Sequence, residues 1–200
     1  MQKKSTALWL TKTAVGIALI LVAQLIGKMI PAIAVIAGPF SVSQLITGTL
    51  VNLILIIITL NVGLGSGTTV GILSSILATL IGIGPIFPII TPLIAMSNVI
   101  LVVIYYCFTK SRKTQNGART KSLKNLYFYI TIVVAAFIKC GFLWLTVPLV
   151  LNYVTSIQSA QRTMLTVMFS WPQAITALCG GILAVIIYPL LQNALSKNTN

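Results

Sequence analysis

Six apolar segments of membrane-spanning length follow one another along the chain. Crossing the hydrocarbon core of a bilayer as an α-helix takes about 20 residues. Inside lipid every backbone polar group must be paired within the segment, so such runs fold as helices. The sequence therefore predicts an all-α integral membrane protein, one six-helix domain over residues 1–200. The approximate spans are 13–30, 42–62, 67–84, 91–109, 126–150 and 165–191.

The charged residues predict how these spans are oriented. Only 13 side chains are charged, and all of them are Lys or Arg. Most lie near the N-terminus, in a basic stretch at about 110–125, and near the C-terminus. Positive charge collects on the cytoplasmic side of membrane proteins, so both termini and the basic stretch are expected there. We assign this charge to topology and contact with anionic membrane lipids, and we expect no nucleic-acid partner.

The chain contains no Asp, no Glu and no His. Their absence excludes paired-carboxylate catalysis, a Ser-His-Asp triad, and metal sites built from carboxylates or imidazoles. It also excludes a proton relay of the Asp/Glu/His type. The three cysteines fall in three different apolar segments, where a lone Cys is typical of packing. We therefore expect neither an enzyme nor a bound cofactor or metal.

The N-terminal segment has a second interpretation. Its charged start, short apolar run and "AIA" at 32–34 are typical of a cleaved secretory signal. The apolar character continues through Ala37, however, and removing the segment would leave five spans with less regular charge sorting. These features favour a retained first span.

Lys139 lies well inside the fifth span, in "AAFIKCGFLW". A lysine in the membrane is costly and usually faces a cavity or a partner. Since the chain has no acid, Lys139 must be neutral, extended toward the interface, paired with backbone carbonyls, or facing an external anion. These alternatives remain open from the sequence.

Other polar side chains are expected at a similar depth on the outward side. Counting 1.5 Å of rise per residue, Lys139 lies about 15 Å, Gln173 about 12 Å and Asn98 about 10 Å from the outer ends of their spans. Trp171 and a helix-loosening Pro172 precede Gln173. Together these residues predict a ligand pocket, although separate helix–helix hydrogen bonds would explain an isolated amide equally well.

Small residues indicate where helices approach closely. In the first span, Ala14 and Ala18 lie four residues apart and form a smooth patch in the cytoplasmic half. Further small residues, interpreted as packing positions, are Gly67, Gly71, Ser74, Ala78, Gly82, Gly180 and Gly181.

Several phrases carry a family resemblance over nearly the whole chain. They are "LITGTLVNLILIIITL", "GIGPIFPIITPLIAMSNVILVV", the lysine Lys139 in the fifth span, and "MFSWPQAITALCGG". With the length and the six spans, they make the chain resemble the substrate-binding S component of an energy-coupling factor (ECF) vitamin transporter.

The resemblance implies a passive vitamin receptor in the plasma membrane, typically bacterial, powered by a separate module. That module consists of a membrane coupling subunit and two ATPases, and the receptor is thought to topple in the membrane to release its vitamin. Ala14 and Ala18 match the small-residue patch that contacts the coupling subunit in the family. The chain lacks a GxxxxGK[ST] loop, so its partners would use the ATP.

The resemblance also places the pocket among the fourth to sixth spans. Lys139 would neutralise a carboxylate or phosphate of the substrate, Gln173 and Asn98 would hydrogen-bond its polar groups, and Trp171 would stack on it or cover it. The loops at 30–40 and 85–92 would act as lids.

The identity of the substrate stays open. A cation such as thiamine finds no carboxylate, which favours a neutral or anionic vitamin: pantothenate, nicotinate, a pyrimidine precursor, biotin or a corrinoid. Two other functions remain as alternatives. One is a stand-alone facilitator or channel, which would need a continuous polar stripe. The other is an accessory membrane protein without a ligand.

Overall fold

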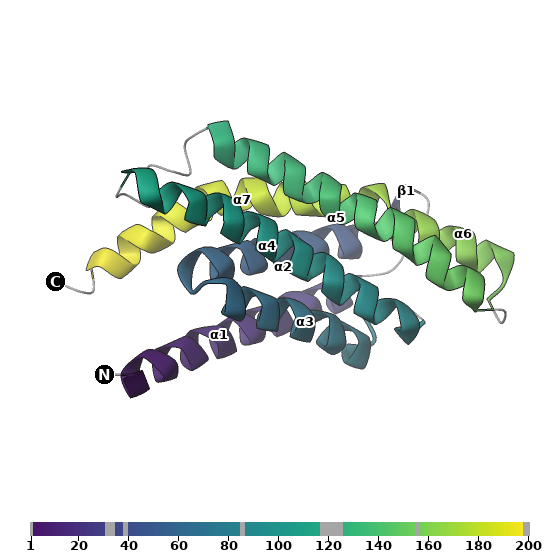
Figure 1. Ribbon diagram of the computed structural model, residues 1–200. Helices are drawn as coiled ribbons and strands as arrows, with labels where there is room; N and C mark the ends of the chain where they lie inside the picture. Colours follow the sequence, from purple (N-terminus) through teal and green to yellow (C-terminus); the bar gives the residue numbers. More distant parts are fainter. Residues whose placement is uncertain are drawn as a thin grey trace.

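A computed structural model describes residues 2–30, 35–37, 40–84, 87–116, 126–154 and 157–197. These residues form a helical bundle with a small two-stranded antiparallel sheet at one end (Figure 1). Its elements are α1 (Gln2–Met29), β1 (Val35–Ala37), β2 (Phe40–Ser41), α2 (Val42–Asn61), α3 (Leu64–Ile81), the 3-10 helix η1 (Pro88–Ile90), α4 (Thr91–Asn116), α5 (Leu126–Tyr153), α6 (Ser159–Met168) and α7 (Trp171–Lys197).

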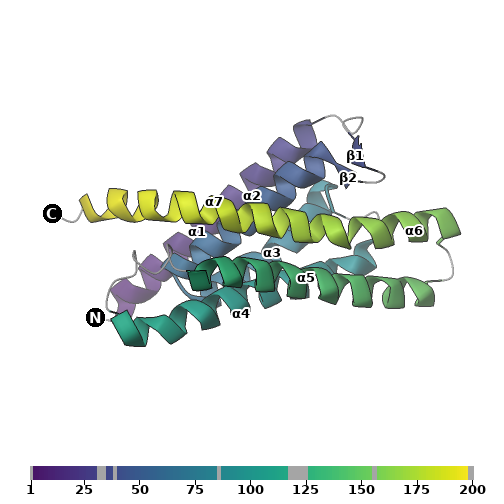
Figure 2. The same cartoon turned by 90° about the horizontal axis from the view of Figure 1, so that it is seen from above.

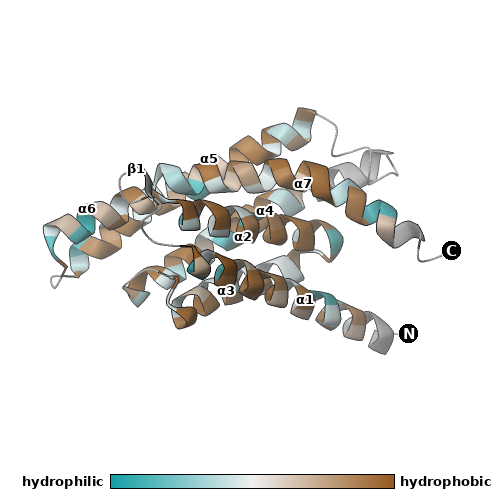
Figure 3. Cartoon of the chain, turned by 180° about the vertical axis from the view of Figure 1, so that it is seen from behind, coloured by the Kyte–Doolittle hydropathy of each residue, from teal (hydrophilic) through white to brown (hydrophobic). Residues whose placement is uncertain are grey.

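The described residues contain six stretches that are long and apolar enough to cross a membrane. The predicted all-α membrane fold is therefore confirmed. Most residues of these helices are hydrophobic, as expected for helices in contact with lipid (Figure 3). The helix ends differ from those predicted: α1 already begins at Gln2, and α3 lies three residues earlier than expected.

The sixth span, predicted at about 165–191 with a helix-loosening Pro172, is found, but it consists of two helices. Helix α6 ends at Met168, and α7 begins at Trp171. Pro172 lies in the first turn of α7, where its missing N–H removes no helical hydrogen bond. The proline thus marks the start of a helix instead of loosening the middle of one.

Both ends of the chain lie at the same end of the bundle, together with the end of α4 and the start of α5 (Figures 1 and 2). Helix α2 packs against α1, α3, α4 and, most extensively, α7. At the opposite end, α5 and α6 project beyond α3 and α4 (Figure 1).

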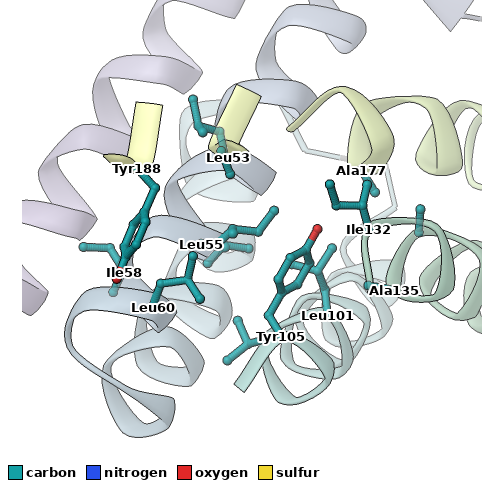
Figure 4. Close-up of a cluster of buried hydrophobic side chains, with 14 of the residues drawn as sticks. Leu53, Leu55, Ile58, Leu60, Leu101, Tyr105, Ile132, Ala135, Ala177 and Tyr188 are labelled. Carbon is teal, nitrogen blue, oxygen red and sulfur yellow. The ribbon is translucent and has the colours of Figure 1, made fainter. Parts of the chain in front are cut away.

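Two separate apolar clusters stabilise the bundle, as expected from the burial of large aliphatic and aromatic side chains. The large core contains residues of α1, α2, α3, α4, α5 and α7. Figure 4 shows part of it. Its members include Leu55, Leu101, Tyr105, Ile132 and Tyr188. The small core lies toward the projecting end and consists of Ile90, Leu143, Val147, Leu151, Ile157, Leu165 and Phe169.

Glycines allow close helix contacts between these cores. A Cβ on Gly180 would lie 2.8 Å from the Cβ of Asn52, and one on Gly71 would lie 3.4 Å from the Cβ of Asn98. Gly82 has another role than the predicted packing, since nothing lies within 4 Å of such a Cβ. With a φ of 77°, it ends α3 in the left-handed conformation that glycine adopts easily.

Candidate functional site

The side-chain amino group of Lys139 is buried in the centre of the bundle, with 3% of the residue exposed. Its Nζ donates hydrogen bonds of 2.7 Å to Oδ1 of Asn52 on α2 and to Oδ1 of Asn98 on α4. Because α5 continues to Tyr153, Lys139 lies about 21 Å from that helix end, deeper than predicted. The lysine therefore does not extend toward the interface. Its partners are two side-chain amides, which the sequence-based alternatives did not include.

Asn98 connects this lysine to α3 and α1. Its Nδ2 donates to Ser74 Oγ and Ser75 Oγ, both at 3.2 Å, and to the Gly71 carbonyl at 3.3 Å. The backbone carbonyl of Ser74 in turn accepts a 2.7 Å hydrogen bond from Gln24 Nε2 on α1. The lysine is thus joined to two further helices through one asparagine.

Asn52 makes the equivalent connection to α7. Its Nδ2 donates to Thr176 Oγ1 at 3.4 Å, and that hydroxyl donates to the carbonyl of Gln173 at 3.1 Å. A continuous set of hydrogen bonds consequently includes a side chain from each of the six long helices. We call it the polar layer: Gln24, Asn52, Ser74, Ser75, Asn98, Lys139 and Thr176, each at most 3% exposed.

The polar layer lies between the two apolar cores. On α5, Lys139 separates Ala136 of the large core from Leu143 of the small core. On α4, Asn98 precedes Leu101 of the large core. A buried polar layer between apolar layers fixes helix register and also supplies directional groups that could hold a ligand.

Two of the predicted site residues lie at the break between α6 and α7. Trp171 is 42% exposed and packs edge-to-face on Phe40, with ring centroids 5.2 Å apart. The side chain of Gln173 donates to the Met168 carbonyl at 3.5 Å, and Gln44 Nε2 donates to the same oxygen at 3.2 Å.

The structure therefore brings Asn98 and Lys139 into direct contact but keeps Trp171 and Gln173 at a second position. That position is still close to the polar layer in space, because the Cys140 thiol donates to the Ser170 carbonyl at 3.2 Å. Cys140 directly follows Lys139, so the helix break is fastened next to the polar layer.

The two predicted lids are described only in part. Residues 31–34 and 38–39 of the first loop, and residues 85–86 of the second, lie outside the described residues. In the first loop, β2 begins at Phe40, which pairs with Ala37 of β1 and contacts Trp171. In the second, η1 is held by Ile90, which is fully buried in the small core.

Ala14 and Ala18 lie on an exposed face of α1. The opposite face packs inward, where Thr13 is buried and its hydroxyl lies 2.6 Å from that of Ser66 on α3. The alanine patch is therefore free for contact with lipid or another protein.

Sequence reasoning missed most members of the polar layer. The criterion that selected Asn98, an amide inside an apolar span, also applies to Asn52 in "LVNLIL" and to Gln24 in "LVAQLI". The sequence predicts a packing role for Ser74, and neither Ser75 nor Thr176 gives a signal of its own.

The comparisons with known proteins agree with this architecture. Residues 9–192 of the 200 match the family model for the substrate-specific component of ECF transporters, a class of transporter subunits and not of enzymes. No curated protein and no solved structure gives a significant match. The chain therefore belongs to the family of ECF transporter substrate-specific components, which are multi-pass membrane proteins that bind the transported substrate.

Proposed function

We propose that this S component binds its substrate at the polar layer, with Lys139 as the central contact, and that the substrate is a small neutral or anionic micronutrient of the vitamin class. The observation that carries the proposal is a buried lysine amino group held by two amide oxygens in a chain without a single acidic residue. We take this group to be an ammonium.

The cost of burying this charge supports a functional role. Transferring an ammonium from water to a protein interior costs several kcal/mol, and uncharged amides offset only part of it. A purely structural layer would be served as well by apolar residues of similar volume. An ammonium has three donors, and the described residues accept two of them. A substrate oxygen that accepts the third would complete the coordination of Lys139.

The other predicted site residues fit the outer part of such a site. Asn98, together with Asn52, would hold the ammonium in place and contact the substrate beside it. Gln173 and Trp171, at the break between α6 and α7, would bind its outer portion, and the loops at 30–40 and 85–92 would cover it. We assign the chain termini and the basic stretch at about 110–125 to the cytoplasm, so the helix break faces outside.

Energy for transport would come from partner proteins. The proposed partners are a membrane coupling subunit, which would contact Ala14 and Ala18, and two ATPases, which would use the ATP. This chain would need no cofactor of its own. Exposure of both alanines on α1, one helical turn apart, supports this assignment.

Co-expression with a coupling subunit and two ATPases tests the proposal. We expect all four proteins to co-purify, and we expect proteoliposomes that contain the complex to take up substrate only when ATP is supplied to the ATPases. Uptake by this chain alone would instead identify a facilitator. Failure to bind both the partners and any small molecule would identify an accessory protein.

A further inference from the structure

We infer that the substrate is a small monoanion, with a carboxylate at Lys139 and with hydroxyl or amide hydrogen-bond donors along the rest of the molecule. This inference rests on the proposed function and narrows the substrate class of the same site. It follows from the charge of the polar layer and from the hydrogen-bonding groups in and beside it that remain unpaired.

The polar layer contains one cation. Elsewhere among the described side chains, Lys28 donates to the Ile81 carbonyl at the end of α3, at 2.7 Å. Arg162 bonds Asn152 Oδ1 at 3.1 Å and the Val154 carbonyl at 3.4 Å, near the end of α5. Neither residue belongs to the layer, nor does the exposed Lys12 near the start of α1. Among the described side chains, Lys139 alone can therefore balance a negative charge there.

A single buried cation favours a single negative charge on the substrate. A phosphate ester carries close to two negative charges at neutral pH. One of them would stay uncompensated among apolar cores, where unpaired charge is strongly unfavourable. A carboxylate carries one charge and has an oxygen that can accept the third donor of Lys139. The charge balance therefore favours a carboxylate over a phosphate.

Unpaired acceptors lie on the same helix as Asn52. The described residues offer no hydrogen-bond partner to Gln44 Oε1 or Thr49 Oγ1, both buried atoms on α2. Gln44 lies about 12 Å along the helix from Asn52, on the side of the helix break, and Thr49 lies between them. Both groups lie near the contact with α6 and α7, since Gln44 Nε2 donates to Met168 and the Thr49 carbonyl lies beside Gly180.

Another unpaired acceptor belongs to the polar layer itself. Gln24 is 2% exposed, and its Oε1 has no partner among the described residues although its Nε2 bonds Ser74. A buried acceptor without a partner is unfavourable. Donors on a substrate would pair with these oxygens while its carboxylate binds Lys139. Ordered water is the competing explanation, because it can pair with buried polar groups in the same way.

Mass spectrometry of small molecules released from the detergent-purified chain tests the inference directly. We expect a compound with one carboxylate and at least one hydroxyl or amide N–H. Titrations with paired probes extend the test: pantothenate against panthenol, and biotin against biotinamide. Pantothenate 4′-phosphate, which adds close to two negative charges to the carboxylate, is the more highly charged probe and should bind more weakly than pantothenate. In any pair that binds, the carboxylate should bind at least ten-fold more tightly than its neutral counterpart.

Protein variants separate the donor requirement from general damage. Thr49→Val removes one unpaired acceptor with little change in shape, and it should weaken a donor-bearing carboxylate several-fold. The matched control is Thr131→Val, because the Thr131 hydroxyl is buried in α5 and bonds its own helix at the Tyr127 carbonyl. It should leave the affinity unchanged.

Each contrary outcome is distinct. A neutral or phosphorylated compound in the purified protein would overturn the inference and leave the proposed function in place. The same holds if a neutral probe binds as tightly as its carboxylate, or if Thr49→Val has no effect. Absence of both a released compound and any probe binding would mean that the unpaired acceptors hold water only, and would contradict the proposed binding role as well.

Discussion

The ammonium nitrogen of Lys139 and the amide oxygen of Asn98 lie 2.7 Å apart, each on a residue that is at least 97% buried. The contact joins α5 to α4 at the level where the two apolar cores end. A charge in such surroundings interacts more strongly than it would in water, since little solvent screens it. Binding of an anion should therefore depend steeply on Lys139 and its two amide partners.

Replacing Lys139 with Met should weaken binding of a carboxylate ligand by ten-fold or more. The variant loses a charge-assisted hydrogen bond, and 1.4 kcal/mol corresponds to ten-fold in affinity. Its stability should change little. The free energy gained by no longer burying a charge offsets the cost of leaving two amide oxygens unpaired. Calorimetric titration of the purified protein measures the affinity.

Lys28→Met is the matched control for this change. Lys28 is exposed at the end of α1, outside the polar layer. It should retain the affinity of the wild type. Equal affinity of the Lys139 variant and this control would remove Lys139 from the binding site.

Asn98→Asp should weaken anion binding while the protein stays folded. The substitution keeps the shape of the side chain but places a negative charge beside the ammonium, which then carries an internal counterion. An incoming carboxylate would be repelled by the new acid, and we expect affinity to fall by at least ten-fold. Asn152→Asp, the same change on an exposed residue near the end of α5, should have no such effect. An unchanged affinity in Asn98→Asp would show that charge at Lys139 does not attract the ligand.

The break between α6 and α7 shows where sequence reasoning ends. The residues across it, Phe169 to Pro172, include two aromatic side chains and continue the apolar run, so hydropathy gives no sign of an interruption. The break is stabilised by partners distant in the chain: Gln44 donates to the Met168 carbonyl, and Cys140 donates to the Ser170 carbonyl. Such contacts depend on the packing of whole helices and cannot be found from local pattern.

Some members of the polar layer could be predicted from the sequence, but the contacts between them could not. A single polar residue inside an apolar run, such as Lys139 or Asn98, stands out in the sequence. Which of these residues meet depends on helix rotation and on close approach at glycines, such as Gly180 beside Asn52. The number of spans required no such knowledge, because length and hydropathy decide it.

The double substitution Ala14→Leu and Ala18→Leu should prevent assembly with a coupling subunit and leave ligand affinity unchanged. Two leucines would keep a partner helix from approaching the small-residue face of α1. Their side chains would point away from the bundle, since both alanines are exposed. Co-purification reports assembly, and calorimetry reports ligand affinity. Ala160→Leu, an exposed alanine on α6, is the matched control and should assemble normally. Assembly of the double variant would place the contact elsewhere.

Gly180→Ala should destabilise the bundle and weaken ligand binding together. The added Cβ would lie 2.8 Å from the Cβ of Asn52 and 2.9 Å from the Thr49 carbonyl oxygen, so α2 and α7 must move apart. Overpacking of this kind costs about 1–3 kcal/mol, and it displaces a direct partner of Lys139.

Gly141→Ala is the control, because nothing lies within 4 Å of its added Cβ. In a helix interior this change should be neutral or stabilise by about 0.5–1 kcal/mol. Thermal unfolding in detergent and calorimetric titration measure both effects. If Gly180→Ala has the same unfolding temperature and ligand affinity as the control, contact between α2 and α7 does not position Asn52 for binding.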